Sequence, residues 1–529
     1  MHQPTLAASL SMVIALSGSA LAQPAGEGAE APPAAEAARP APAAEASETA
    51  ELEPAELSDD AAALQARLHA QLGRPGGLTS QEAARRAADT SLQAAARDSD
   101  VDAAEADVDK ALVEAFPRLT LIARYTRLSA IEEPSLGFGG GGRSLLMTDD
   151  PDGQVGVVDP TTDTLFRIPA SALSFSFPQI LNQYYLQAGV NIPLSDYLLR
   201  TRQAVAAARH SKQSAKLQAR AARQASAAQA RAVYYNWVRA RLQLVVVEQT
   251  LAQVREQHRI AKLLFEGGRG SRADMLRAES LVANAELGIG RARKAVVLTE
   301  DQLRTVMHDE ASRNYEIGED VTARASRLDH EEDLQRLLTE ARRNRLELRA
   351  MDEWGKSLRQ ARRVVKAGNL PRLEGFANAY YANPHPRYIP AQEQWNASWD
   401  AGLQLTWSPN DYGTSNATAS NLDAQMAKVR AERRALEDTI RADVIAAHQG
   451  MQEARLAMKT AETGLVAAEE GYRVRRKLFQ YGRASTVEVV DAETTLLAAR
   501  LDRVNAQVDL LIAKALLDHA VGREKVATR

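Results

Sequence analysis

Residues that could carry chemistry are scattered along this sequence, and none stands at the spacing of a reaction centre. The nine histidines form no H-x-x-x-H pair and do not lie at metal-ligand spacing from acids. The glycine run at 139–142 lacks the strand-to-helix setting and the lysine of a phosphate-binding loop. No serine lies in a nucleophile elbow. The sequence therefore argues against an enzyme and predicts no cofactor and no metal.

Composition excludes further classes of protein. The 529 residues are 45% hydrophobic and 25% charged, which is typical of a folded chain. They include no cysteine, which rules out a disulfide framework, a thiolate zinc site and lipid attachment through a cysteine. The formal net charge of −3 gives no general case for nucleic acid as a partner.

The N-terminal region has the pattern of a secreted precursor. A short apolar stretch ends in the triplet Ala-Leu-Ala, so residues 1–22 are expected to form a signal peptide. Residues 23–77 are rich in Ala, Pro and Glu, and ten acids against one base lie within 23–60. This composition predicts a disordered periplasmic tail over 23–77.

Long windows without proline predict where the helices lie. No proline falls within 76–116, 194–370 or 410–529, and a proline inside a helix costs about 3 kcal/mol. Glycine breaks and capping residues divide these windows into six expected helices, over 79–115, 197–266, 271–308, 330–366, 411–480 and 485–521.

The spacing of apolar residues in the last two helices is that of a coiled coil. In 411–480 the spacing alternates between four and three at Ile440, Val444, Ala447, Met451, Ala454, Met458, Ala461, Leu465, Ala468 and Tyr472. In 485–521 the expected seam begins at Val490, Thr494 and Leu497. A helix of about 70 residues is roughly 100 Å long, which indicates a coiled-coil assembly rather than an ordinary globular domain.

The two halves of the chain repeat each other. Residues 265–280 align with 479–494 without gaps and share Phe, Gly, Arg, Ser, Ala and Glu. The triplet Pro-Arg-Leu opens an expected strand in each half, at 117–119 and 371–373. The chain then divides into a first repeat, a second repeat and a C-terminal tail, over 78–310, 311–522 and 523–529.

Four strands are expected, at 117–128, 183–193, 371–382 and 397–408, with a long outer loop at 129–182. Each strand alternates an apolar and a polar face and carries aromatic residues near its ends, which is typical of strands that cross an outer membrane. A water-soluble sheet lying on the helices would show the same alternation. A closed barrel needs about eight strands, so the membrane interpretation requires several copies, and three would supply twelve.

The repeated turn F-x-x-G-x-x-S-x-x-[DE]-[VM], with the paired hairpins, resembles the TolC-type outer-membrane efflux channels over about 78–522. The resemblance implies a mostly helical fold with a long antiparallel coiled-coil α-barrel. It implies two β-hairpins per chain that give four strands to the 12-stranded outer-membrane β-barrel of a homotrimer. It also implies a location in the outer membrane, with a large α-helical portion in the periplasm.

The function implied by this resemblance is a passive exit duct in tripartite efflux or type I secretion. The implied partners are a periplasmic adaptor protein, an inner-membrane transporter of the RND or ABC class, and outer-membrane lipid. Two alternatives remain open from the sequence: a periplasmic coiled-coil scaffold or adaptor that never enters a membrane, and an enzyme with a helical stalk. The outer loop and the acidic tail depart from the family pattern.

The resemblance also suggests gate residues. Glu488 and Asp491 match the acidic constriction of the family, and a trimer would place six such carboxylates around the axis. Glu488 equally fits the third position of a helix-capping box, which needs no gate. Asp274 paired with Arg269 or Arg483 is the candidate latch of the closed state, and a surface ion pair of little energy is the alternative.

The two turns are expected to be the exposed periplasmic tips that meet the adaptor. Their residues are Gly267, Gly268, Arg269 and Gly270 in the first half and Tyr481, Gly482 and Arg483 in the second. Glycine permits a close approach of backbones and arginine offers hydrogen-bond donors. A glycine that only ends a helix is the alternative.

Overall fold

The computed structural model describes residues 59–130, 154–159, 164–169, 180–309, 315–328, 331–389, 391–481 and 483–524. The expected signal peptide and the first part of the expected tail lie outside these residues. So do Gly482, the last residues of the C-terminal tail and most of the outer loop.

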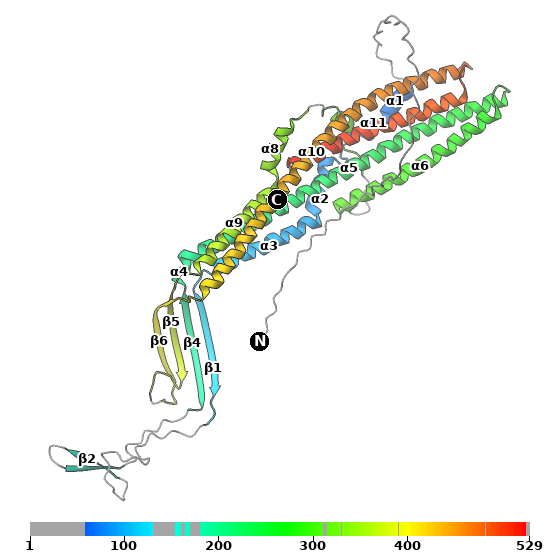
Figure 1. Ribbon diagram of the computed structural model, residues 1–529. Coiled ribbons are helices and arrows are strands. Elements are labelled where there is room, and N and C mark those ends of the chain that lie inside the picture. Colours follow the sequence, from blue (N-terminus) through cyan, green and yellow to red (C-terminus); the bar gives the residue numbers. More distant parts are fainter. Residues whose placement is uncertain are drawn as a thin grey trace, which may run out of the picture. The chain divides into compact units, whose positions relative to one another are not determined.

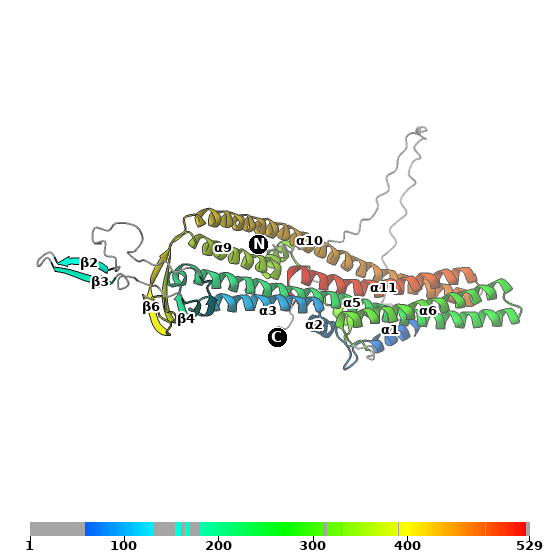
Figure 2. The same cartoon turned by 90° about the horizontal axis from the view of Figure 1, so that it is seen from below.

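Two helical hairpins of matching length make up most of the described chain (Figure 1). The first joins α5 (Arg202–Glu266) to α6 (Arg272–Met307), and the second joins α10 (Asp411–Gln480) to α11 (Thr486–Val521). Both α6 and α11 have 36 residues. A short π-helix of 5 residues, η2 (Tyr197–Thr201), and the 65 residues of α5 together match the 70 residues of α10. Because α5 also packs against α11, the hairpins lie side by side (Figure 2).

Each short helix expected before a hairpin of strands is instead two helices separated by one residue. The first pair is α2 (Ser80–Thr90) and α3 (Leu92–Val113), and the second is α8 (Leu334–Asn344) and α9 (Leu346–Ala367). The breaks are Ser91 and Arg345, whose ψ angles of 120° and 117° are extended rather than helical. The duplication therefore includes the break, which no proline or glycine marks in the sequence.

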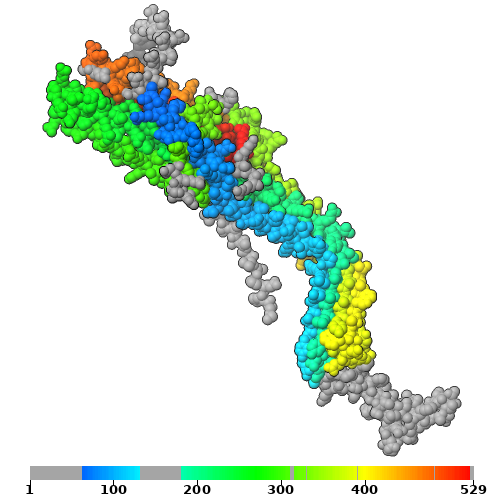
Figure 3. Space-filling model, turned by 180° about the vertical axis from the view of Figure 1, so that it is seen from behind, coloured from blue at the N-terminus to red at the C-terminus, as the bar shows by residue number. Residues whose placement is uncertain are grey.

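The four expected strands form one antiparallel sheet in the order β1-β4-β5-β6 (Figure 1), and the cyan, green and yellow surfaces of these segments adjoin in Figure 3. They are β1 (Arg118–Arg127), β4 (Asn182–Ile192), β5 (Arg372–Asn383) and β6 (Asn396–Thr406). The short helix α4 (Leu194–Asp196) packs on β5 and leads the chain towards α5. Within the expected outer loop, β2 (Gln154–Asp159) and β3 (Thr164–Pro169) pair as a separate hairpin.

Part of the segment predicted to be a disordered tail is folded, so that prediction is wrong for residues 59–77. They include the helix α1 (Asp59–Gln71), where Leu64 is 5% exposed, and Leu72 just beyond it is also buried. Leu64, Leu68 and Leu72 recur every fourth residue. They form an apolar stripe that packs against α5 and the core around it. The Ala- and Glu-rich average composition concealed this stripe.

The segment after α1 is tied to the middle of the chain. Leu78 N donates to Glu316 O at 2.8 Å, and Gly318 N donates to Leu78 O at 2.9 Å. A Cβ atom on Gly318 would lie 2.2 Å from Gly77 O, so only glycine permits this close backbone approach. The connection leads to the short helix α7 (Val321–Ala325), which packs against α11.

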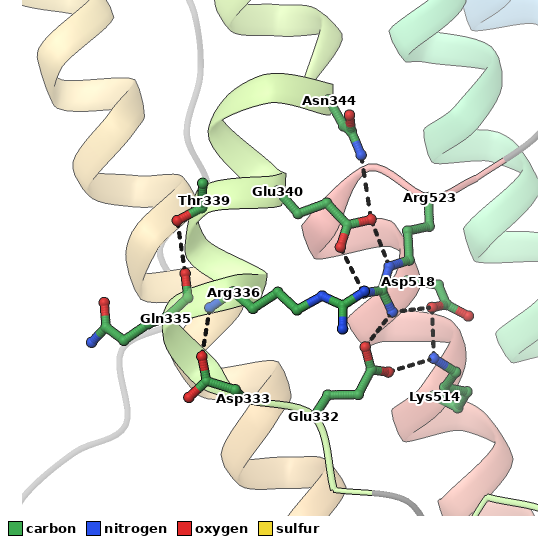
Figure 4. A network of polar contacts seen from close by, with 10 residues as sticks. All are labelled: Glu332, Asp333, Gln335, Arg336, Thr339, Glu340, Asn344, Lys514, Asp518 and Arg523. Atoms are coloured by element: carbon green, nitrogen blue, oxygen red, sulfur yellow. Dashed lines mark hydrogen bonds and ion pairs between the residues drawn. The ribbon is translucent and has the colours of Figure 1, made fainter.

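The first residues of the expected C-terminal tail, Arg523 and Glu524, are held in place by ion pairs. The Arg523 guanidinium lies 2.6 Å from Glu332 and 2.7 Å from Glu340, and Lys514 joins the same network (Figure 4). Hydrogen bonds to Glu340 are the main reason that the pKa of Arg523 is raised. The Glu524 carboxylate is buried 2.9 Å from Arg231 of α5. These ion pairs hold the end of α11 against α8 and α5.

Aromatic residues of α5 occupy the middle of the largest apolar core. Trp237 and Tyr234 are fully buried, and their ring centroids are 5.8 Å apart. Tyr234 OH donates to Leu78 O at 2.9 Å, and Tyr315 packs edge-on against Trp237 at 6.2 Å. The core therefore joins α5 to both the N-terminal segment and the connection between the two repeats.

Candidate functional site

The turns of the two helical hairpins carry the same helix caps. Ser271 Oγ accepts from Asp274 N at 3.1 Å at the start of α6, and Ser485 Oγ accepts from Glu488 N at 3.4 Å at the start of α11. In each cap an acidic residue stands at the third helical position, where the positive end of the helix dipole favours it. The duplicated sequence thus folds into a duplicated local structure.

The backbone of the two turns also matches. Arg269 N donates to Leu264 O at 2.9 Å, and Arg483 N donates to Leu478 O at 2.8 Å. Gly268 has a φ of 71°, a left-handed conformation in which glycine has no Cβ penalty. The turn glycine of the first hairpin therefore does shape the tip.

Both tips expose apolar side chains. Tyr481 is 80% exposed, and the other exposed apolar residues close to the turns are Leu263, Phe265, Leu478 and Val487. The predicted tip residues Gly267, Gly268, Arg269 and Arg483 are exposed as well, whereas Gly270 is half-buried. Apolar groups on two neighbouring tips, with arginines among them, suit a protein partner better than water.

The carboxylate of Asp274 connects the two hairpins. Ser271 Oγ donates to it at 2.6 Å, and this bond, with a smaller contribution from the nearby Thr486 hydroxyl at the start of α11, lowers the pKa of Asp274. In the described part of the chain Asp274 forms no ion pair with Arg269 or Arg483. The hydroxyl groups of Ser271 and Thr486 therefore take the place of the predicted arginine partners. The third helical position keeps the Asp274 carboxylate next to Ser271, the residue that caps its own helix.

The two predicted gate carboxylates lie on one face of α11, three residues apart. Ser485 N donates to the Glu488 carboxylate at 2.8 Å, which completes the capping box. Asp491 is exposed one turn further on. The capping role of Glu488 is thus present in the single chain, and the gate role of both residues stays a prediction.

A third carboxylate, which the sequence analysis did not select, is buried beside them. Glu493 is 5% exposed, and burial raises its pKa to about 7 in spite of the nearby charges of Arg500 and Arg476. Its counterpart in the first repeat, Glu279, is exposed. The two repeats therefore differ in the environment of the same acid.

One face of the sheet is apolar and exposed. Strand register places Leu121, Ala188, Ala379 and Trp399 side by side across all four strands. Large side chains exposed on this face include Leu119, Leu121, Leu186, Tyr381, Trp399, Leu403 and Leu405. An apolar face of this extent is unusual on a water-exposed protein surface and marks contact with an apolar environment.

Aromatic rings lie together at one end of this face. Tyr184 is 5.2 Å from Tyr125 and 5.7 Å from Trp395, and Tyr381 stacks on Trp395 at 4.8 Å. Amphipathic rings are enriched where a membrane meets water. Among the helices of the described residues, none combines the length and the apolar character that a membrane span requires.

The opposite face of the sheet is polar and hydrogen-bonded across its strands. Asn378 Nδ2 donates to Asp400 at 2.9 Å, and Gln187 Nε2 donates to Asn378 Oδ1 at 3.2 Å. Arg387 forms an ion pair with Asp400 at 2.7 Å. This face suits water rather than lipid.

The sequence model of the family described as Outer membrane efflux protein matches residues 80–307 and 337–523. The chain belongs to this family. The match covers both repeats, so the predicted family and the predicted two-repeat, mostly helical fold with four strands are confirmed. Helix α1 lies outside the match.

Solved outer-membrane proteins, two of them described as channels, are similar to this efflux protein in fold. VceC from Vibrio cholerae is 15% identical with a TM-score of 0.62, over 88% of this chain and 99% of VceC. CmeC from Campylobacter jejuni is 13% identical with a TM-score of 0.62, over 90% of this chain and 94% of CmeC. MtrE from Neisseria gonorrhoeae, in its open state, is 15% identical with a TM-score of 0.62, over 84% and 88%. No curated protein sequence matches the chain.

As a member of this family, the efflux protein is an outer-membrane efflux channel with a long helical periplasmic portion, and not an enzyme. The alternative of a scaffold that never enters a membrane is thereby wrong, as is that of an enzyme with a stalk. Channels of this family are homotrimers that work with efflux systems.

Proposed function

We propose that the protein is the passive exit duct of a tripartite efflux or type I secretion system. A periplasmic adaptor and an inner-membrane transporter of the RND or ABC class would open it, and the transporter would supply the energy. The observation that carries the proposal is the pair of matched, exposed tips, each with a capped helix start, apolar side chains and an arginine.

The two faces of the sheet support a membrane duct built from three copies. Three sheets of four strands supply twelve, enough to enclose a channel. The apolar face would contact lipid, and the polar face with Asn378, Asp400 and Gln187 would line the passage.

The tips would receive the adaptor. The exposed rings of Tyr481 and Phe265 offer apolar anchors, while Arg269 and Arg483 offer donors on the rim of the same surface. An adaptor that docks here also reaches the starts of α6 and α11, where Asp274 links the two hairpins. Docking and opening would therefore be coupled by a single contact region.

For the gate, Glu488→Ala combined with Asp491→Ala should raise single-channel conductance in planar bilayers and weaken block by divalent cations. The reason is that a trimer would lose six carboxylates from the constriction. Without these charges the constriction attracts divalent cations less strongly, so they block it less. The control, Asp438→Ala with Glu462→Ala, removes two exposed acids from α10 and should leave both quantities unchanged. Unchanged conductance and block in the gate variant would exclude these residues from the gate.

For the latch, Asp274→Ala and Thr486→Val should each increase the open fraction of the channel in the same bilayer assay. Both remove the contact between the first turns of α6 and α11. Ser271→Ala is the control, because it removes a helix cap worth about 1 kcal/mol and keeps the carboxylate near Thr486. If the control opens the channel as much as the two latch variants do, helix fraying rather than the bridge governs opening.

A further inference from the structure

Two arginines and two tyrosines alternate on the polar face of the sheet. The Arg124 guanidinium of β1 lies 5.7 Å from the centre of the Tyr185 ring on β4. The ring centres of Tyr185 and Tyr380, on β4 and β5, are 6.0 Å apart. The Arg387 guanidinium, in the connection between β5 and β6, lies 5.7 Å from the centre of the Tyr380 ring. These four residues are called the arginine–tyrosine cluster.

Strand register places the arginine–tyrosine cluster near the end of the sheet that is remote from the helices. Arg124 pairs with Tyr185 three positions before β1 ends at Arg127. Helix α3 leads into the opposite end of β1 (Figure 1). Along β4, Tyr185 lies between Tyr184 and Leu186, whose side chains belong to the apolar face. The cluster therefore faces the passage of the proposed duct, near its outer end, and not the lipid.

A series of hydrogen bonds holds the two rings of the cluster in place. Tyr185 OH donates to Gln187 Oε1 at 2.9 Å, and Gln187 Nε2 donates to Asn378 Oδ1 at 3.2 Å. Asn378 in turn donates to Asp400, which forms an ion pair with Arg387 at 2.7 Å. Since Arg387 also lies over the second ring, one network fixes both rings. A site whose groups are already ordered loses less conformational entropy when a ligand binds.

The two arginines of the cluster differ in their partners. Arg387 donates to Trp399 O at 3.0 Å and forms its ion pair with Asp400, so its charge is compensated. Arg124 is exposed and, in the part of the chain that the structure describes, is paired with no carboxylate. Its guanidinium therefore keeps its hydrogen-bond donors for an acceptor that comes from the passage.

No acid on the strands offsets the charge of Arg124. The four strands of the sheet carry two acids, Asp400 and Glu374. Asp400 is already paired with Arg387. Glu374 lies towards the other end of the sheet, where Asn191 donates to it at 3.2 Å. A negatively charged solute is therefore favoured beside Arg124.

We propose that Arg124 and the rings of Tyr185 and Tyr380 bind planar aromatic anions, that is, aromatic carboxylates or sulfonates. The anionic group accepts hydrogen bonds from the Arg124 guanidinium, whose flat shape matches two oxygens at once. The aromatic ring of the solute packs against the tyrosine rings in an offset or edge-on arrangement. A solute with only one of the two groups loses one of the two contacts. The role of this site in export rests on the proposed duct, whereas the binding itself does not.

Binding of naphthalene-2-sulfonate to the full-length protein in detergent tests the site, measured by equilibrium dialysis with empty micelles as the blank. The wild-type protein should bind it about tenfold more tightly than naphthalene-2-sulfonamide, which lacks the charge, or methanesulfonate, which lacks the ring. Arg124→Gln should weaken binding about tenfold, and so should Tyr185→Leu combined with Tyr380→Leu. Equal binding of the three solutes, or unchanged binding in Arg124→Gln, would overturn the proposal.

Arg118→Gln is the matched control. Arg118 is an exposed arginine on the same strand and the same face, six residues and therefore about 20 Å from Arg124. Its replacement should leave binding unchanged. If both variants lose binding equally, any cation on the polar face attracts the probe and the site is overturned.

Conductance in planar bilayers is measured separately from binding. A wild-type channel that conducts but does not bind naphthalene-2-sulfonate overturns this site alone. A protein that binds the probe through Arg124 but does not conduct overturns the duct alone.

Discussion

Trp237→Ala is expected to lower the free energy of unfolding by about 3–5 kcal/mol, the range for removing a fully buried tryptophan from a core. Trp237 has no exposed surface, and its ring meets Tyr234 and Tyr315. The guanidinium of Arg241 lies 5.4 Å from the centre of the same ring. The loss would therefore loosen α5 from the connection between the two repeats as well as create a cavity.

The measurement is the denaturant or thermal unfolding midpoint of the detergent-solubilised protein. Trp354→Ala is the matched control, because Trp354 of α9 is 41% exposed and should cost far less. Trp237→Phe should lie between the two, since it keeps an aromatic ring in the core. Equal losses from Trp237→Ala and Trp354→Ala would show that the core around α5 does not govern stability.

The long helices could be predicted from the sequence because proline and glycine mark their ends. The expected helix at 411–480 has the bounds of α10, and 271–308 differs from α6 by one residue at each end. The breaks at Ser91 and Arg345 have no such mark, because one residue with an extended ψ interrupts a helix without any change in composition. The strands were found because alternation has a period of two and every strand has one apolar face.

The coiled-coil seam was predicted correctly on α10 but not at the start of α11. All ten seam residues named on α10 are buried or half-buried. On α11, Thr494 is exposed, while Val489, Glu493 and Leu496 are buried. The buried face at the start of α11 is therefore shifted by one residue from the face that the apolar spacing predicts. It includes a polar side chain, that of Glu493, at a position where the seam would normally hold an apolar one.

The candidate site was only partly predictable, because some of its contacts depend on local sequence and others on the packing of the two hairpins. The turn motif located the tips and the carboxylates of Asp274, Glu488 and Asp491, because caps depend on local sequence. The contact between Asp274 and Thr486 depends on how two hairpins pack, which local sequence does not specify. Glu493 carried one usable signal, an acid at seam spacing between Val489 and Leu496.

Glu493→Gln is expected to stabilise the protein at alkaline pH and to change little at acidic pH. The folded-state pKa of Glu493 is raised to about 7 from an ordinary value of 4.5, with burial as the main cause. Between these two values the folded protein holds a proton that the unfolded chain releases. The free energy of unfolding therefore falls as pH rises through this window, and its full loss is on the order of 3 kcal/mol.

The charges around Glu493 do not offset this fall in the free energy of unfolding. The nearest cations are Arg500 on the same helix and Arg476 on α10, and both lower its pKa without cancelling the effect of burial. Glu469 on α10 lies near Arg500 and Arg503 and also has a raised pKa, mainly through burial. A glutamine at position 493 keeps the shape and the hydrogen-bonding capacity of the protonated acid and cannot ionise.

Unfolding midpoints measured from pH 4.5 to pH 8 in one detergent would test this expectation. The wild-type protein should lose stability as pH rises towards 7, and Glu493→Gln should lose less over the same interval. Glu279→Gln changes the corresponding acid of the first repeat, which is exposed, and should leave the pH profile as it is. Parallel profiles for the wild type and Glu493→Gln would mean that Glu493 ionises at an ordinary pH, because water or a cation reaches the interface of α5, α10 and α11.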